Sequence, residues 1–474
     1  DKEFDIHTVI RSNWDNTSEC LEEELTRHFE IIFDITPINQ NPQKVNLLQN
    51  FSLLPYLGIN QKEIMKWLGL NRETNLLFDL YNAGWLEKSE NQEYSMHPLI
   101  SYTVRKYNSP TLKDCFQLVS SMSEQIHITE GDNYVELFFY LPYADSVGKY
   151  FRNRNTESDL ILGRLFCELA TIYAANGEYG NAYSWGEAAG FQMESINDCK
   201  EKTVLLNVLF NAMAEICLDM RNRNEECKEW AEKAVQHDEK HPDTISKLQI
   251  SNSFHNLGCA YIQLRDNKKA LQYETLALNI RKKYLKDSHM KLLNVQRNLA
   301  MIYRRQGQIQ EAFEMQWAVV RCLFKLHHDN LYHPDFPVAY SLYSFILRDQ
   351  KKLQAAICYQ KAAARVREHN NDKDPKLAIN YNNLGVFERE YGNLCEAEEW
   401  QKRAIETDLR LRGPDHIDLA TDYYNYALIL REKKEYKEEL RYLEECLRIE
   451  KLAETDDTKY IDDQKEEIYK LMRA

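Results

Sequence analysis

Amide and guanidinium side chains recur at a nearly constant spacing along the second half of this 474-residue sequence. Amides can hydrogen-bond the backbone of an extended peptide, and guanidinium groups bind carboxylates or phosphates. These residues therefore offer non-covalent recognition of an acidic or polypeptide ligand. The alternative is that the amides bond within the protein and the arginines pair with Glu390 and Glu432. The recurring residues are Asn256, Asn298, Asn383 and Asn425, together with Arg304, Arg389 and Arg431.

The motifs of covalent and phosphoryl-transfer chemistry are missing from the sequence. It contains no nucleophile elbow, no cysteine with a placed histidine and no cleft-type cluster of carboxylates. A P-loop requires G-x-x-x-x-G-K-[ST], but the Gly148-Lys149 pair is followed by Tyr150. Acidic runs such as 22–24 are typical of solvated helix faces. We therefore expect no enzyme and no catalytic residue in this sequence.

Histidine, proline and aspartate occur together at three places that could suggest a metal site. Each place falls between two expected helical hairpins, where proline favours a helix start and aspartate can cap it. The segment HHDNLYH (327–333) adds no carboxylate-backed ligand set. We therefore expect capping and no bound metal. The three places are residues 241–243, 333–335 and 414–416.

The composition favours a soluble protein built of helices. Only 15 glycines and 11 prolines occur, roughly half of average usage, which disfavours turn-rich sheets. The net charge of −14 repels nucleic acid and anionic membranes, so neither is an expected partner. The eleven cysteines show no C-x-x-C pair, which indicates reduced thiols. We expect a cytoplasmic protein.

Internal repetition begins near residue 160 and sets the architecture. A position that usually holds a small residue recurs at steps of 42 to 44 residues, and alanine is frequent twelve residues later and seven beyond that. Small side chains let two helices approach closely, so each unit is predicted to be a helical hairpin. The aligned positions are Ala170, Ala214, Gly258, Ala300, Tyr343, Gly385 and Ala427.

These units resemble tetratricopeptide repeats, and NNLGVFEREYGNLCEAEEWQKRAIETDLRLRGPDHIDLATDYYNYA is similar to the kinesin light chain type. The resemblance implies an all-α, right-handed superhelix of about seven to eight hairpins, with seven repeats over 158–448 and a polar capping helix over 449–474. The first helix of each hairpin would line a concave groove. Residues two or three before, and four or five after, the aligned position would face this groove. These positions hold the recurring asparagines and arginines of the first paragraph, together with His255, Arg297, Arg305, Tyr340, Arg348 and Tyr424.

Residues 42–107 follow a different pattern, in which three short helices precede a hairpin. Apolar spacing predicts helices over Val45–Leu54 and Asn60–Trp67, and a third between a capping Asn71 and Gly84. The segments WLEK and YSMH alternate around the polar turn SENQE, and a further helix follows. This order is typical of a small winged-helix domain. Its seven basic and six acidic residues nearly balance, so DNA binding is not expected.

The segment LFDLYNAGWLEKSENQEYSMHPLISYTVRKY resembles the winged helix of NB-ARC type STAND ATPases. That family carries a Met-His-Asp motif at the end of the wing, which Met96 and His97 match, whereas Pro98 replaces the aspartate. By resemblance, His97 would contact the ADP β-phosphate and stabilise the resting state. The alternative is that His97 only caps the following helix. Without a P-loop, we expect no cofactor in this chain and ADP or ATP binding in a longer protein.

The same resemblance assigns the remaining segments and the function. Residues 1–41 would end a helical linker subdomain, 108–157 would form an irregular hairpin, and the sequence would be the carboxy-terminal part of a bacterial STAND protein. The repeats would then be a sensor arm for signal transduction, which binds a protein or peptide and regulates an upstream nucleotide-binding domain. The alternative is a winged-helix transcriptional regulator that responds to a peptide. An upstream P-loop would favour the first, and an upstream DNA-binding domain the second.

Overall fold

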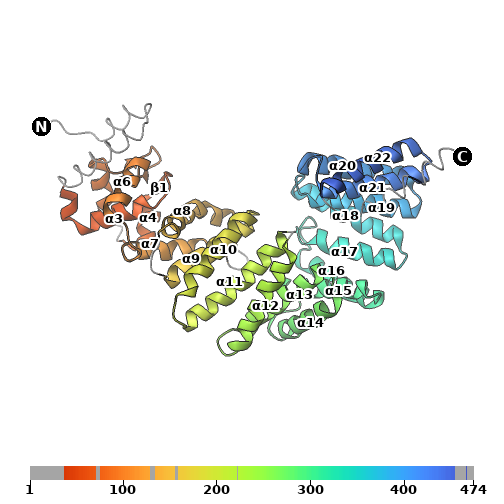
Figure 1. The fold of residues 1–474 in the computed structure, drawn as a ribbon, viewed down its shortest axis with the longest axis horizontal. Helices are drawn as coiled ribbons and strands as arrows, with labels where there is room; N and C mark the ends of the chain where they lie inside the picture. The colour runs from red at the N-terminus through yellow and green to blue at the C-terminus, as the bar shows by residue number, and fades with distance from the viewer. Residues whose placement is uncertain are drawn as a thin grey trace. The chain divides into compact units, whose positions relative to one another are not determined.

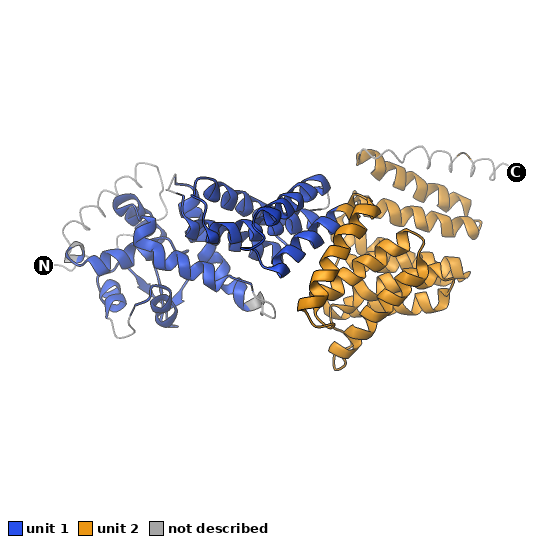
Figure 2. Ribbon diagram, turned by 90° about the horizontal axis from the view of Figure 1, so that it is seen from below, with its two compact units in different colours: residues 1–260 blue, residues 261–474 orange. Residues whose placement is uncertain are grey.

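The computed structural model describes residues 37–70, 75–128, 134–154, 158–220, 223–453 and 466. The chain forms two compact units, residues 1–260 and 261–474 (Figure 2). Helices dominate both units (Figure 1). Among the described residues, none of the helices is both long and apolar enough to cross a membrane. The linker subdomain expected over 1–41 and the capping helix expected over 449–474 lie largely outside the described residues.

The first unit begins with short helices and a small antiparallel sheet with the strand order β1-β3-β2. The helix expected from Asn60 is present with Asn60 as its N-cap, and the positive φ of Gly84 (+78°) follows the end of the third helix. The expected cap Asn71 lies outside the described residues. The elements are η1 (Pro37–Gln40), α3 (Pro42–Ser52), β1 (Ile59–Asn60), α4 (Gln61–Trp67), α5 (Leu76–Asn82), β2 (Glu87–Lys88), β3 (Glu93–Ser95) and α6 (Pro98–Asn108).

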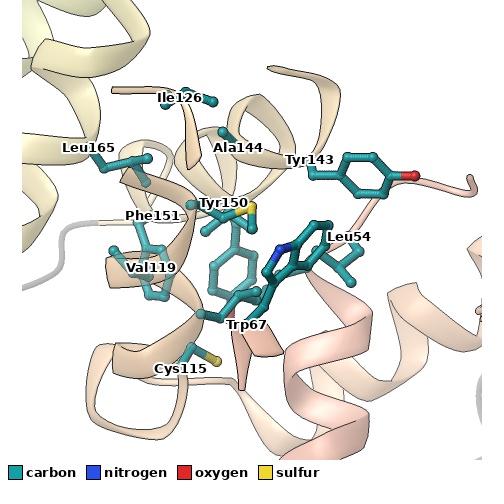
Figure 3. Close-up of a cluster of buried hydrophobic side chains, with 14 of the residues drawn as sticks. Leu54, Trp67, Cys115, Val119, Ile126, Tyr143, Ala144, Tyr150, Phe151 and Leu165 are labelled. Carbon is teal, nitrogen blue, oxygen red and sulfur yellow. The ribbon is translucent and has the colours of Figure 1, made fainter. Parts of the chain in front are cut away.

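The hairpin of α7 (Leu112–Gln125) and α8 (Tyr134–Arg152) joins these elements to the repeats through one hydrophobic core (Figure 3). Trp67 of α4 packs edge-on against Tyr143 of α8, with 5.3 Å between the ring centroids. The Tyr143 hydroxyl donates to the backbone oxygen of Gly58 over 3.0 Å. Leu165, on the first repeat helix, lies in the same cluster. The amino-terminal elements and the first repeat therefore share a buried core.

Seven helical hairpins follow, as the period predicts. We call the first helix of each hairpin the A helix and the second the B helix. The seven pairs, in chain order (Figure 1), are α9 (Leu160–Ala175) and α10 (Tyr179–Glu194), α11 (Lys200–Asp219) and α12 (Asn224–Lys240), α13 (Lys247–Gln263) and α14 (Asn267–Tyr284), α15 (Met290–Arg305) and α16 (Ile309–Leu326), α17 (Phe336–Asp349) and α18 (Leu353–Asn370), α19 (Lys376–Tyr391) and α20 (Leu394–Arg412), and α21 (Ile417–Glu432) and α22 (Tyr436–Leu452).

The aligned positions are buried in every repeat, but the alignment of the fifth repeat was wrong by one residue. Ser344 on α17 is fully buried, and so are Ala356 and Ala363, which lie twelve and nineteen residues further on. The first, third, fourth, sixth and seventh repeats have buried residues at the same spacing, and the second repeat has one extra residue. Ser344 is therefore the small residue of this repeat, and its neighbour Tyr343, which is 5% exposed, adds apolar bulk beside it. Arg348 thus lies four residues after the aligned position, as Arg304, Arg389 and Arg431 do.

A fully buried polar side chain near the middle of α14, α16, α18 and α20 links each of these B helices to the A helix of the next repeat. We call these side chains the buried bridges. Gln316 donates from Nε2 to the backbone oxygen of Ala339 over 2.8 Å. Gln401 donates to the backbone oxygen of Asp422 over 3.1 Å and to the side-chain oxygen of Asn382 over 2.7 Å. The buried bridges of the second unit are Glu274, Gln316, Gln360 and Gln401.

A buried group of charged side chains connects α20 to α21. Arg412 donates to Asp408 over 2.8 Å and contacts Asp418 over 2.7 Å. Asp422 is 3% exposed. Burial, followed by the charges of Asp408 and Asp418, raises the pKa of Asp422 to about 8. The folded protein therefore favours the protonated form of Asp422.

The Gln401 bridge can be tested by removing its hydrogen bonds while its volume is kept. We expect Gln401→Leu to lower the free energy of unfolding by about 1–3 kcal/mol, because buried partners lose a donor. The melting temperature should fall by roughly 2–4 °C for each kcal/mol. Gln354→Leu, at an exposed position of α18, is the matched control and should change stability by no more than about 0.5 kcal/mol. Equal effects of the two changes in thermal melts would show that the bridge does not stabilise the repeat junction.

Asp422 predicts a pH dependence of stability. Its folded pKa lies above the ordinary value, so the folded state retains a proton that the unfolded chain loses, and stability falls as the pH rises from about 4 to about 8. Asp422→Asn should flatten this part of the profile and raise the melting temperature near pH 8. Asp372→Asn, at an exposed carboxylate, should leave the profile unchanged. Melts at a series of pH values would contradict the assignment if Asp422→Asn kept the original slope.

Candidate ligand groove along the A helices

The arginines near the carboxyl ends of the A helices form a ladder from repeat to repeat. Each one contacts an acidic residue of the next A helix, and the acidic residue directly follows the arginine of that helix. We call these contacts the arginine ladder. The second and third helices of the ladder, α17 and α19, carry an Arg-acid dipeptide in their last turn, which both receives one contact and makes the next. The rungs are Arg304 with Asp349 at 2.5 Å, Arg348 with Glu390 at 2.7 Å and Arg389 with Glu432 at 3.0 Å.

Aromatic rings hold two of these guanidinium groups in place. Arg304 lies 5.0 Å from the centroid of the Phe345 ring, and Arg348 lies 5.6 Å from that of Phe387. Both phenylalanines belong to the next A helix, so each arginine contacts that helix by charge and by stacking. The ion pairs are only partly buried, and the Arg304 side chain remains 25% exposed. The ladder is therefore accessible from solvent.

The contacts made at the two ends of the arginine ladder differ from those within it. Arg431 of the last repeat contacts Glu439 in its own hairpin, at 2.6 Å. In α15, Arg305 occupies the position that later repeats give to an acid, and it donates to the backbone oxygen of Ile262 over 2.9 Å. Burial and then the charges of Arg265 and Arg304 lower the pKa of Arg305. Positive charge is therefore concentrated at the start of the ladder.

The predicted asparagines differ in exposure. Asn256 is buried and donates to Asn211 over 2.9 Å. Asn298 is 9% exposed and donates to the buried bridge Glu274 over 2.7 Å. Asn425 is partly exposed and donates to Asn382 over 2.9 Å. Asn383 is partly exposed, and within the described part of the chain it has no hydrogen-bond partner. The amides therefore contribute to packing between repeats, and Asn383 offers the most available hydrogen-bonding group.

A cavity of about 360 Å³ opens where α15, α16 and α17 meet. Arg297 and Asn294 of α15 and Asp335 before α17 supply its polar lining, and Leu293 and Val319 are among its apolar lining residues. Arg297 is partly exposed. The structure thus places this predicted groove residue in a concave site with mixed polar and apolar walls, a combination typical of ligand pockets.

The other predicted groove residues have different surroundings. Tyr340 is 5% exposed and stacks on Phe336 with 5.1 Å between ring centroids, and burial raises its pKa to about 12. It belongs to the core of the fifth repeat. Tyr424 and His255 are partly exposed. Ligand binding by the predicted residues as a group stays a prediction.

His97 lies at the start of α6, where it caps the helix. Its Nδ1 accepts a hydrogen bond from the backbone N–H of Leu99 over 3.2 Å, and its ring lies edge-on to Tyr56 with 5.8 Å between centroids. The capping alternative for His97 therefore describes its position in this structure. The contact with a nucleotide phosphate stays a prediction.

The aspartates of the three His/Pro/Asp segments do not cap helices as expected. His416 caps α21, because its Nδ1 accepts from the N–H of Asp418 over 3.2 Å. Asp335 is the N-cap residue of α17, but its side chain makes no capping hydrogen bond. Before α13, Ser246 accepts from the N–H of Gln249 over 3.3 Å. An imidazole nitrogen or a hydroxyl takes the capping role, so the Asp335 carboxylate can contact other groups.

Comparisons with known proteins agree with this fold. Residues 249–316 and 376–451 match the tetratricopeptide repeat family. The clustered mitochondria protein homolog of Aspergillus oryzae is 28% identical over 126 residues, which cover 26% of this chain and 10% of that protein. The chain thus matches about a tenth of the length of such curated relatives.

Solved structures resemble larger parts of the chain. A Rap protein in complex with the competence and sporulation factor has a TM-score of 0.50 at 11% identity, and the match covers 76% of this chain and 97% of that one. A STAND protein with a tetratricopeptide repeat sensor from Pyrococcus horikoshii has a TM-score of 0.49 at 15% identity, with 96% and 68% covered. The fold of this chain is that of an all-α tetratricopeptide repeat protein.

Proposed function

We propose that the A helices of the second unit bind an acidic protein or peptide segment, and that the chain is the sensor arm of an NB-ARC type STAND ATPase. The observation that carries the binding proposal is the arginine ladder. It places guanidinium groups at the repeat spacing, and each is held by a partly exposed partner. A ligand with carboxylates at matching intervals can take over these arginines one by one.

The energetics of exchange favour such a ligand. Partly exposed ion pairs stabilise a protein by only about 0–1 kcal/mol, so replacing Asp349 or Glu390 by a ligand carboxylate costs little. The displaced acid side chain can turn toward water. Phe345 and Phe387 keep the guanidinium groups oriented during the exchange, and an oriented guanidinium loses less conformational entropy on binding.

The cavity at Arg297 can anchor one residue of the ligand. Its volume of about 360 Å³ lies near the lower end of the usual range for ligand pockets, about 300–1,000 Å³. Arg297 and Asn294 can bind a carboxylate or a backbone group, while the apolar wall accepts an aliphatic side chain. The solved Rap protein with the same kind of fold was crystallised with the competence and sporulation factor, which supports a regulatory ligand for helical arrays of this type.

The shared core of the first unit supports the sensor-arm proposal. The Ser146 hydroxyl donates to the backbone oxygen of Leu53 over 2.7 Å, and the Tyr150 hydroxyl donates to that of Pro110 over 3.0 Å. Both side chains lie on α8, so the hairpin before the repeats is bonded to the helices around α3. A change in the packing of the first repeats would therefore reach residues 42–107, which contain the segment that resembles the winged helix of the STAND family.

Reversing the charge of one arginine in the ladder tests whether the ladder binds a ligand or is only structural. A library of fluorescent peptides graded from acidic to basic provides the probe, and anisotropy identifies an acidic binder. We expect Arg304→Asp to lower its affinity at least about tenfold, because one charge-assisted contact is lost and a repulsive one is added. The double change Arg304→Asp with Asp349→Arg should restore the melting temperature by re-forming the pair. It should leave affinity weakened, because the guanidinium group has moved to another helix.

Two controls accompany this test. Arg410→Glu alters an exposed arginine of a B helix and should leave acidic-peptide binding unchanged. Affinity of the unaltered chain should weaken with added salt, since partly exposed contacts are screened over a Debye length of about 8 Å at physiological ionic strength. If Arg304→Asp and Arg410→Glu had the same effect, or if no acidic peptide bound, the arginine ladder would be a structural feature alone.

The nucleotide part of the proposal predicts a negative result for this chain by itself. The sequence has no P-loop, and the Nδ1 of His97 already accepts a backbone hydrogen bond, so we expect no ADP binding at micromolar concentration. Isothermal titration of ADP into the chain measures this directly. Micromolar affinity would contradict the proposal that the phosphate-binding elements lie elsewhere.

A further inference from the structure

The loop between α16 and α17 brings two imidazoles and a carboxylate together. His327 is the C-cap residue that follows α16, Asp335 is the N-cap residue before α17, and His333 lies between them. The Oδ2 atom of Asp335 lies 3.2 Å from Nε2 of His327 and 3.3 Å from Nδ1 of His333. The three potential ligand atoms all lie within 4.8 Å of one another. Three side chains that are eight residues apart at most thus converge on one point.

The separations fit the coordination shell of a small divalent ion. Zinc binds imidazole nitrogen and carboxylate oxygen at about 2.0–2.2 Å in a tetrahedral arrangement, which places neighbouring ligand atoms roughly 3.3–3.6 Å apart. The two measured separations, 3.2 and 3.3 Å, lie close to this value.

The loop ends are fixed by packing and by backbone hydrogen bonds. Leu323 and Phe336, on the two flanking helices, are at most 2% exposed. The N–H of His327 donates to the oxygen of Leu323 over 2.9 Å, and the N–H of Phe336 donates to the oxygen of His333 over 3.2 Å. The backbone that carries the three side chains is therefore held at both ends of the loop, which lowers the entropy lost on metal binding.

We propose that His327, His333 and Asp335 bind a divalent transition-metal ion of the Zn²⁺ type. Two imidazole nitrogens and one carboxylate oxygen form a donor set that suits Zn²⁺ better than Mg²⁺ or Ca²⁺, which prefer oxygen ligands alone. Three protein ligands leave a fourth tetrahedral position for water or for a ligand atom. This site departs from the expectation of no metal drawn from the sequence, because the spacing alone did not show that His327 faces Asp335.

One side-chain adjustment accompanies binding. The rings of His327 and His333 are stacked, with centroids 3.4 Å apart and planes 9° from parallel. Both rings must splay so that their lone pairs point to the same position. Rotation about the bond between Cβ and the ring is a shallow torsion, and both side chains are partly exposed.

The site stands independently of the ligand groove, but the two are adjacent. Asp335 contacts both imidazoles and also lines the cavity that contains Arg297. A bound ion would fix the loop of residues 327–335 and add positive charge next to this cavity. The open coordination position would then be available to a carboxylate held there.

Titration of Zn²⁺ into the EDTA-treated chain tests the proposal. We expect one site, whose affinity for Zn²⁺ falls at least about tenfold in His327→Gln and in Asp335→Asn. Loss of a side chain that only hydrogen-bonds to a metal ligand already lowers metal affinity by about this factor. Zn²⁺ should raise the melting temperature of the unaltered chain and have a smaller effect on these variants. Circular dichroism confirms that the variants keep their helices.

Matched controls distinguish this site from other metal-binding groups. His328→Gln removes an exposed imidazole of the same loop and should keep the affinity of the unaltered chain. Cysteines such as Cys322 on α16 could also bind zinc, so Co²⁺ is used as a second probe. Binding at the proposed site gives Co²⁺ absorption without a thiolate charge-transfer band. A thiolate band at the tight site, or unchanged Zn²⁺ affinity in both His327→Gln and Asp335→Asn, would overturn the proposal.

Discussion

The docking of each hairpin of the second unit on the next depends on a polar side chain that is fully buried between them. A buried amide without a partner costs about 1–3 kcal/mol, so Gln316, Gln360 and Gln401 stabilise only those arrangements in which the next A helix presents an acceptor. Apolar packing between small residues allows close approach but tolerates sliding. The buried bridges add a directional requirement, and the helix-end contacts of the arginine ladder form within the register that they set.

In the proposed function, the arginine ladder would serve both stability and recognition. Its arginines are not spare charges, because each already has an acidic partner. A ligand must therefore compete with the protein's own carboxylates, which excludes weakly acidic or poorly spaced competitors. Selectivity of this kind arises from the internal ion pairs that a ligand must displace as well as from the contacts that the ligand itself would make. Phe345 and Phe387 would keep the guanidinium groups of Arg304 and Arg348 oriented while a ligand carboxylate replaces the internal one.

The helical hairpins could be predicted from the sequence, because spacing and small residues follow directly from helix geometry. The one-residue error at Tyr343 arose because Tyr343 and Ser344 are both buried, so the aromatic residue was aligned in place of the small one. The sequence named Glu390 and Glu432 as alternative partners of the arginines, and the structure pairs them with Arg348 and Arg389. The partner of Arg304, Asp349, was not predicted, since it lies more than 40 residues further on. The recurring dipeptides Arg348-Asp349, Arg389-Glu390 and Arg431-Glu432 were the available signal. The proximity of His327 and Asp335 depends on the path of an irregular loop, which has no periodicity to reveal it.

The Arg-acid dipeptide also bears on how such an array can lengthen. A hairpin that ends its A helix with this dipeptide carries both halves of the contact, one for the preceding neighbour and one for the following neighbour. Duplication of the unit that contains α19 and α20 would therefore produce a copy that already fits between its parent and the next hairpin. Arg305 breaks the rule, since it presents an arginine where an acid is required. Duplication of hairpins on the carboxy-terminal side of α15 would therefore preserve the Arg-acid contacts between neighbouring hairpins. The helix α15 would mark the boundary of the region in which this holds.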